Sequence, residues 1–430
     1  MRAMKDSGIE WIGEIPQDWG LRKIKTNFDI IAGATPKSGE ASFWDGDIPW
    51  ITPADYTTEG IYVSAGHKSI TLDGLNSCAT SLIPEGSIIF SKRAPVGLVA
   101  INSNPLCTNQ GCLSCVPKDA VDAKYYYYVM SIYGEQFDLF ASGTTFKEIS
   151  ADVFANFKLP YPDFETQKQI VSFLDAKCAE IDALIAAKEK TNALLKERRQ
   201  SIIYEAVTKG LDPTVPMKDS GVEWIGEIPE GWEIAALKRL GIPATGSTPS
   251  KDSADYWDGD IPWVSSKDMK SDYILDSEDH ITQAAVDECG LTLFPPGTLI
   301  FCVRSGILRH TFPVAVSTLQ VTINQDLRAL SLTADVDPAF LLYYMRGMND
   351  TIVTLYQKIG ATVESIEMDW FLYFPVVLPS HEEQDRIVEA LDSRCASLDQ
   401  TVKQNEATIK QLKEYRQSLI YEAVTGKIEV

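Results

Sequence analysis

The sequence predicts an α+β protein made of two related halves, each a mixed α/β segment followed by a long helix. Three observations predict this fold. Long stretches of the chain occur twice, each copy contains short β-like runs bracketed by turn signals, and each copy closes with a long heptad-spaced segment. At 430 residues the chain is also too long for one ordinary core, so two or more domains are expected.

The internal repeat is the strongest signal. Residues 4–19 recur as residues 217–232, with 13 of 16 positions identical, and the heptapeptide Trp44-Asp-Gly-Asp-Ile-Pro-Trp50 recurs unchanged from residue 257. Residues 167–208 align with residues 384–425, with 22 of 42 positions identical, which is too many for chance. The repeat predicts four segments, two mixed and two helical, with the boundaries 1–162, 163–210, 211–379 and 380–430.

The first part of each copy is predicted to be mixed α/β. Short β-like runs occur at 87–90 and 298–301 after Pro-Gly turn signals, and a helix-like stretch follows near 125–132 and 340–348. We interpret Asp45-Gly-Asp47 and its copy Asp258-Gly-Asp260 as hairpin turns, because no further carboxylates complete a calcium loop. The four tyrosines at 125–128 are expected to fill a core, with base stacking as the alternative.

Each copy closes with a long helix that carries an apolar stripe. Residues 166–209 contain no Gly or Pro, and Gly210 is expected at the carboxyl cap. The stripe advances in steps near 3.5 residues, interrupted by Lys188, Asn192 and Arg199, which favours a coiled-coil seam with the other long helix of the same chain. The alternative is that each helix packs only on its own globular segment. The stripe consists of Ile170, Leu174, Cys178, Ile181, Ile185, Leu195 and Ile202, and then of Ile387, Leu391, Cys395, Leu398, Val402, Ile409, Leu412 and Leu419.

The ends of the helices suggest a closed arrangement. The first helix ends in Tyr-Glu-Ala-Val-Thr208 and leads through linker 210–216 into the second copy, and the second helix ends in the same five residues. The sequence therefore reads as a two-unit cycle cut at one linker. Pseudo-twofold symmetry is expected to bring the two termini close together.

Composition excludes several classes of protein. Formal charge is 39 − 60 = −21, which excludes a polycation wrapped in nucleic acid. The charge does not exclude DNA binding through local basic patches. No apolar run reaches the roughly 18–20 residues of a membrane helix, and the amino terminus does not resemble a signal peptide. Eight scattered cysteines indicate a reduced, cytoplasmic protein. Cys112-x-x-Cys115 lacks the second pair of a zinc ribbon, so we interpret it as part of a strand and expect no metal.

The sequence contains no convincing catalytic motif. A phosphate-binding G-x-x-x-x-G-K-[ST] loop, a dinucleotide-binding G-x-G-x-x-G turn and an H-E-x-x-H zinc motif are all missing. The Asn-Pro-Pro-aromatic run that holds an amino group for methylation is also missing, and Asp337-Pro-Ala-Phe340 comes nearest. We therefore expect a non-catalytic protein with no cofactor of its own.

Differences between the copies point to possible recognition residues. Residues identical in both halves build the scaffold or meet the same partner twice, whereas residues that differ can distinguish two targets. The variable stretches are 57–80 against 270–292, 91–108 against 302–322, and 129–150 against 346–366. Arginine can bind guanine in a bidentate contact, Asn or Gln can bind adenine, and a matched pair such as Arg93 and Arg304 can grip phosphate instead. The DNA-binding candidates in and beside these stretches are Lys92, Arg93, Asn109, Gln110, Lys147, Arg304, Arg309, His310, Asn324 and Gln325.

Taken together, these motifs resemble the specificity subunits of Type I restriction-modification enzymes. The resemblance spans nearly all of the chain. Its strongest feature is Leu-Pro followed by a Gln-containing helix that ends in Glu-Ala-Val-Thr, which occurs twice. The other matching segments are 11–16 and 224–229, 44–50 and 257–263, Asn109-Gln110 and Asn324-Gln325, and 143–149 and 360–366.

The resemblance implies two target recognition domains of mixed α/β type, joined by two long antiparallel coiled-coil helices. It further implies a non-catalytic subunit that binds a split, asymmetric site on double-stranded DNA. Two modification subunits would methylate adenine with S-adenosylmethionine, and two restriction subunits would use ATP and Mg. The repeated helix ends would offer two equivalent docking surfaces, formed by Tyr204 and Glu205 and by Tyr421 and Glu422. The alternatives are a coiled-coil scaffold that never touches nucleic acid and a self-standing DNA-modifying enzyme.

Overall fold

The structure is a computed structural model that forms two compact units. Unit 1 consists of residues 1–188 and 406–430, and unit 2 of residues 189–405. The two units have the same element order and the same sheet topology, so the repeat predicted from the sequence is also a structural repeat. The residues that the structure describes are 2–57, 60–143, 147–333, 335–358 and 362–430.

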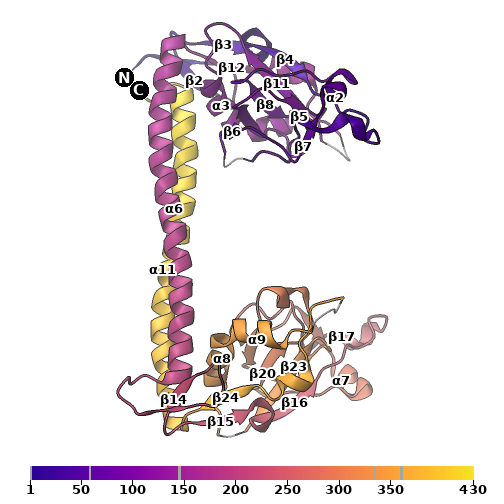
Figure 1. Cartoon of the computed structure of the whole chain (residues 1–430), viewed down its shortest axis with the longest axis vertical. Coiled ribbons are helices and arrows are strands. Elements are labelled where there is room, and N and C mark those ends of the chain that lie inside the picture. Colours follow the sequence, from indigo (N-terminus) through magenta and orange to yellow (C-terminus); the bar gives the residue numbers. More distant parts are fainter. Residues whose placement is uncertain (1, 58–59, 144–146, 334, 359–361) are drawn as a thin grey trace. The chain divides into compact units, whose positions relative to one another are not determined.

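Unit 1 contains a five-stranded sheet in the order β4-β11-β8-β9-β6 and a three-stranded sheet in the order β10-β5-β7 (Figure 1). Only the β6–β9 and β5–β10 pairs are parallel in these two sheets. The strands are β1 Met4–Asp6, β2 Glu14–Pro16, β3 Gly20–Lys23, β4 Phe28–Ala32, β5 Trp44–Ile51, β6 Tyr62–Val63, β7 Lys68–Ile70, β8 Ile88–Ser91, β9 Val99–Asn102, β10 Cys107–Thr108, β11 Cys112–Pro117 and β12 Lys158–Tyr161. The short helices are α1 Ile24–Asn27, α2 Leu72–Asn76, α3 Ala123–Ile132, α4 Gly134–Leu139 and α5 Ala151–Asn156.

Unit 2 repeats this plan, with sheets in the orders β16-β23-β20-β21-β18 and β19-β17-β22. Its strands are β13 Met217–Asp219, β14 Glu227–Pro229, β15 Glu233–Ala236, β16 Gly241–Thr245, β17 Trp257–Val264, β18 Tyr273–Ile274, β19 Asp279–Ile281, β20 Leu299–Cys302, β21 Val314–Ser317, β22 Thr322–Ile323, β23 Leu327–Leu332 and β24 Pro375–Leu378. Its short helices are α7 Gln283–Cys289, α8 Pro338–Gly347, α9 Asn349–Tyr356 and α10 Met368–Phe371.

Two long helices contribute to both units, α6 Phe164–Lys209 and α11 His381–Val424. In unit 1 an ion pair joins Asp182 Oδ1 to Arg416 Nε at 3.0 Å, and in unit 2 its repeat joins Asp399 Oδ1 to Arg199 Nε at 3.1 Å. Partner numbers on α11 fall as those on α6 rise, so the helices pair antiparallel. The apolar stripe predicts that the two helices pair, and the pseudo-twofold repeat predicts this orientation. A buried amide pair, Asn405 Nδ2 donating to Asn192 Oδ1 at 2.8 Å, completes the seam in unit 2.

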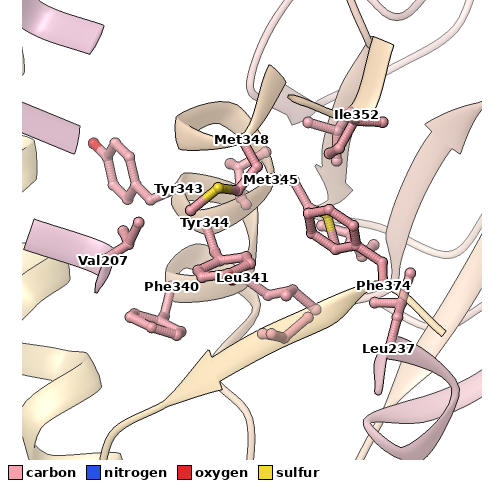
Figure 2. Packing of buried hydrophobic residues seen from close by; sticks show 14 of the residues in the cluster. Val207, Leu237, Phe340, Leu341, Tyr343, Tyr344, Met345, Met348, Ile352 and Phe374 are labelled. Atoms are coloured by element: carbon pink, nitrogen blue, oxygen red, sulfur yellow. The ribbon is translucent and has the colours of Figure 1, made fainter. Parts of the chain in front are cut away.

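Each α/β module packs through its central helix against the paired long helices. In unit 2, the apolar residues of α8 lie between Val207 of α6 and Phe374 beside β24, and Figure 2 shows this cluster from close by. In unit 1 the four tyrosines of α3 are all buried in the equivalent cluster. The other face of each five-stranded sheet is covered by a smaller apolar cluster around Ile51 or Val264. The sheet is therefore buried on both faces, which explains why most residues of its central strands are apolar.

A buried glutamine ties each long helix to its own module. Gln167 Oε1 accepts the backbone N–H of Asp122 at 2.9 Å, and its Nε2 donates to the carbonyl of Pro162 at 3.0 Å. Gln384 makes the same two bonds in unit 2, to Asp337 N–H at 2.8 Å and to the carbonyl of Pro379 at 3.1 Å. Asp122 and Asp337 cap α3 and α8, so each glutamine joins two helix starts. This contact explains why a Gln stands five residues after a Pro in both copies.

The termini lie together in unit 1 (Figure 1). The hydroxyl of Tyr421, near the end of α11, donates to the carbonyl of Ile12 at 3.0 Å. In unit 2 the hydroxyl of Tyr204 makes the equivalent bond to the carbonyl of Trp224, at 3.0 Å. The amino-terminal segment of each copy therefore packs on the end of a long helix. The expectation that the two termini lie close together is confirmed.

The interpretation of the two Asp-Gly-Asp sequences as hairpin turns is wrong. Both lie inside long strands, β5 and β17, where the pairing register shifts at a β-bulge. Asp45 and Asp258 take the left-handed conformation, with φ of 58° and 59°. A side chain on Gly46 would lie 2.6 Å from the carbonyl oxygen of Ile70, so a bulge that presses against its neighbour requires glycine there.

Candidate nucleic-acid interface

Three segments converge beside the end of β8 in unit 1, and they carry the DNA-binding candidates of the first half. The backbone N–H of Lys92 donates to the carbonyl of Gly111 at 2.9 Å, which places the loop after β8 against the Asn109-Gln110 turn. The N–H of Ile149 donates to the carbonyl of Lys92 at 3.0 Å, which adds the segment from Lys147. The structure therefore brings together residues that lie up to 55 positions apart in the sequence. Thr144, Thr145 and Phe146 lie outside the described residues.

Acidic side chains already neutralise the cations of this surface. The Glu148 carboxylate binds both Lys92 Nζ and Arg93 Nε at 2.7 Å, and Lys147 Nζ lies 2.6 Å from Asp138 Oδ2. The hydrogen bond from Lys92 lowers the pKa of Glu148, and Arg93 lowers it further, so the carboxylate is ionised at neutral pH. The local charge is therefore close to balance, in keeping with an acidic chain.

The second half assembles an equivalent surface with different residues. The N–H of Arg304 donates to the carbonyl of Asp326 at 3.2 Å, and the N–H of Ser305 to that of Glu364 at 3.0 Å. Arg309 pairs with Glu364 through its Nε at 2.8 Å, and His310 is exposed beside it. Arg304 is also exposed, and within the described part of the chain its side chain has no acidic partner. The segment from Ile359 to Ala361 lies outside the described residues.

The asparagine and glutamine of each Asn-Gln turn have separate roles. Asn109 Oδ1 accepts the N–H of Gly111 at 2.9 Å, and Asn324 Oδ1 accepts the N–H of Asp326 at 3.1 Å, so the asparagines shape the turns. Gln110 and Gln325 are exposed. Each accepts a hydrogen bond from a threonine hydroxyl, Thr35 in unit 1 and Thr248 in unit 2. The sequence analysis missed these two threonines and the acidic partners Glu148 and Glu364. The Gly-x-Thr-Pro sequence that precedes both β5 and β17 could have identified the threonines.

The predicted helix-pair residues fall into two groups by burial. Leu174, Cys178, Ile181, Ile185, Leu391, Cys395 and Leu419 are buried, and Leu195, Ile202, Leu398, Val402 and Leu412 are partly exposed. The residues predicted to face partner subunits differ in how exposed their side chains are to solvent. Tyr204 and Tyr421 are half-buried and use their hydroxyls inside the unit, as described above, whereas Glu205 is exposed and Glu422 half-exposed.

The two cysteines of the C-x-x-C sequence point to opposite faces of a strand. Cys112 belongs to the smaller apolar cluster and Cys115 to the larger one, because residues three apart in β11 alternate in direction. Burial raises the pKa of the Cys112 thiol to about 12. Among the described residues no group of three His, Cys, Asp or Glu side chains is placed to hold a metal ion, and no helix there is long and apolar enough to cross a membrane.

Comparison with known proteins agrees with this architecture. The family model of the Type I restriction modification DNA specificity domain matches residues 16–196 and 229–414. The chain is 29% identical over 427 residues to the Type I restriction enzyme MjaIX specificity subunit of Methanocaldococcus jannaschii, which covers 97% of this chain and 95% of that protein. It is 27% identical to the EcoR124I/EcoR124II specificity subunit of Escherichia coli over 63% of this chain and 62% of that one.

Solved structures show the same fold. A chain from a structural study of the assembly and conformational transition of the type I R-M system covers 96% of this chain and 99% of its own length, with a TM-score of 0.75 at 17% identity. The HsdS subunit of Thermoanaerobacter tengcongensis covers 96% and 98%, with a TM-score of 0.54 at 16% identity. Since the family model matches most of the chain as two copies, the protein belongs to the Type I restriction-modification DNA specificity family, with one specificity domain in each half.

Proposed function

We propose that the chain gives a Type I restriction-modification enzyme its DNA sequence specificity, with each unit binding one part of an asymmetric bipartite site. One observation carries the proposal: the two units share one frame but differ in the side chains of the surface where three segments converge. Lys92 and Arg93 stand in unit 1 where Val303 and Arg304 stand in unit 2, and the loops that follow differ in sequence. Two surfaces with different side chains would bind two half-sites of different base sequence.

The division of labour follows the four segments predicted from the sequence. Segments 1–162 and 211–379 would bind DNA, and segments 163–210 and 380–430 would hold them and bind partners. Members of this family are generally non-catalytic, and we propose that S-adenosylmethionine, ATP and Mg act in the modification and restriction subunits. Two modification subunits would dock at the repeated helix ends, where Glu205 and Glu422 remain accessible.

The local charge balance bears on how DNA would bind. Of the cationic candidates, Lys92, Arg93, Lys147 and Arg309 are each paired with an acid, so phosphate has to compete with a carboxylate. Phosphate contacts supply most non-specific affinity, so this chain alone is expected to bind non-cognate DNA weakly. We expect firm binding to need the basic surface of the modification subunits as well as the correct bases.

Methylation mapping tests the proposal. The chain is co-expressed with its modification partner in a host that lacks other adenine methylation, and long-read sequencing maps methylated adenines. The expected result is a split, asymmetric motif, of which replacing residues 57–150 by the equivalent stretch of another family member alters one arm only. A continuous motif, a palindromic motif, or a replacement that leaves both arms unchanged would contradict the proposal.

A further inference from the structure

Both units contain the same exposed pair of neutral side chains, although the residues around the pair differ. In unit 1 the hydroxyl of Thr35 donates to Gln110 Oε1, and in unit 2 the hydroxyl of Thr248 donates to Gln325 Oε1. The threonine comes from the loop after β4 or β16, and the glutamine from the turn before β11 or β23. The two residues of each pair are about 75 positions apart in the sequence. The pair is therefore a tertiary contact, and it is present in both units.

A rigid frame holds the two loops of each pair together. Trp50 Nε1 donates to the carbonyl of Ala34 at 3.0 Å, and Trp263 Nε1 donates to that of Ser247 at 3.0 Å. The two loops also meet backbone to backbone. A Cβ atom on Gly33 would lie 2.2 Å from the carbonyl oxygen of Asn109, so only glycine allows this approach.

This frame fixes which atom of the glutamine is offered outward. Its oxygen is occupied by the threonine hydroxyl, which leaves the amide nitrogen as the donor. Within the described residues the nitrogen of Gln110 has no acceptor, and that of Gln325 has one long contact, 3.4 Å to Asp326 Oδ2. In unit 1 the pair also borders the loop after β8 that carries Lys92 and Arg93. The backbone N–H of Lys92 donates to the carbonyl of Gly111, the residue next to Gln110. A neutral donor of fixed direction therefore lies at the edge of the candidate interface in each unit.

We propose that Gln110 and Gln325 bind the sugar–phosphate backbone of DNA, and that Thr35 and Thr248 position them. The proposal rests on the function proposed above. If the units read different bases, a group that is identical in both is suited to contact what every half-site contains, which is the backbone. Glutamine amides are common phosphate ligands, and an uncharged one suits a surface on which most of the cations are already paired. Adenine binding by these glutamines, which their residue type also allows, is the alternative that the experiment separates from backbone binding.

The test uses the full chain assembled with its modification partner and duplexes with or without the mapped motif. Gln110→Ala and Gln325→Ala are each expected to weaken binding of both duplexes by the same factor, roughly three- to tenfold for one neutral hydrogen bond. The methylated motif and the slope of affinity against salt should not change, since no charge is removed. Gln400→Ala removes an exposed glutamine near the middle of α11, outside the variable stretches, and is the control that should have no effect.

The positioning role has its own readout. Thr35→Val should weaken binding in the same direction as Gln110→Ala, Thr35→Ser should restore it, and the double variant should be no weaker than Gln110→Ala alone. A change of motif at one base would show that the glutamine reads sequence, and unchanged affinity would show that it does not touch DNA; either overturns the proposal. Loss of affinity that tracks a lowered Tm would overturn it too. If the parent chain yields no split motif, the function proposed above fails first, before any variant is measured.

Discussion

Replacing the buried Gln167 by methionine isolates the contact that joins a recognition module to its long helix. The Gln167 side chain is fully buried and bonds the N–H of Asp122 and the carbonyl of Pro162. Methionine has nearly the same length and shape but replaces neither bond. Gln167→Met therefore leaves one buried donor and one buried acceptor without a partner while filling the same space.

The expected loss of stability follows from these two groups. Each buried group that loses its partner costs about 1–3 kcal/mol, and the apolar methionine regains part of the total. We expect a net loss of about 2–4 kcal/mol, a large share of the roughly 5–15 kcal/mol that holds a domain folded. Unit 1 has 188 + 25 = 213 residues, a size at which each kcal/mol lowers Tm by about 2–4 °C.

Guanidinium and thermal unfolding of the purified chain measure the effect. Gln411→Met is the matched control in unit 1, because Gln411 is exposed on α11 and the substitution is the same. In unit 2, Gln384→Met should repeat the loss and Gln400→Met should not. If Gln167→Met and Gln411→Met both unfold within about 0.5 kcal/mol of the parent, the buried glutamine does not hold the module in place.

Four further predictions concern other contacts. Glu148→Gln removes the acidic partner of Lys92 and Arg93, so affinity for non-cognate duplexes should rise. The slope of affinity against salt should steepen by about one counterion, and the methylated motif should stay the same. An unchanged slope would mean that these cations do not reach phosphate. The pKa of Glu148 is lowered in the folded state, so its contribution to stability is present at neutral pH and is lost as pH falls through that folded value; acid titration of Glu148→Gln should show a smaller loss than the parent, and an equal loss would refute the linkage. Gly33→Ala pushes a methyl group into the carbonyl oxygen of Asn109 and should cost about 1–3 kcal/mol together with DNA affinity, whereas Gly39→Ala, where nothing lies within 4 Å, should be neutral in both assays. Removing one matched heptad from α6 and from α11 should change the gap of the methylated motif and keep both arms, and altered arms with a fixed gap would refute the helices as spacers.

The repeat made most of the fold predictable from the sequence. Thirteen matches in residues 4–19 and a 3.5-residue stripe sufficed to predict two modules and paired helices, because periodicity and duplication are local signals. The bulge at Asp45 was not predictable. Asp-Gly is a strong turn signal, and only the close approach of Gly46 to the carbonyl of Ile70 shows why the strand continues.

The candidate site was predictable only in part. Residue type and position in or beside the variable stretches made Arg93 and Gln110 DNA-binding candidates, but nothing local indicated that Glu148 neutralises the first or that Thr35 orients the second. Both partners come from segments 55 or more positions away, so they become neighbours only when the sheet forms. Sequence patterns gave the candidate side chains, and the tertiary contacts determine which of their atoms stay available to a ligand.

The hydrogen bonds kept in both units come mostly from uncharged donors, whereas the cations around them vary. Tyr128 donates to Asp175 at 2.8 Å and Tyr343 to Asp392 at 2.6 Å, at repeated positions. In unit 1 Lys124 also binds Asp175, but in unit 2 Arg346 binds Asp272 instead. A hydrogen bond fixes direction as well as distance, while an exposed ion pair is screened by salt and tolerates many geometries. A module that must present different side chains in the same orientation can therefore change its charges only if neutral, directional hydrogen bonds hold its backbone in place. The Thr–Gln pair and the bonds of the buried glutamines are hydrogen bonds of that kind.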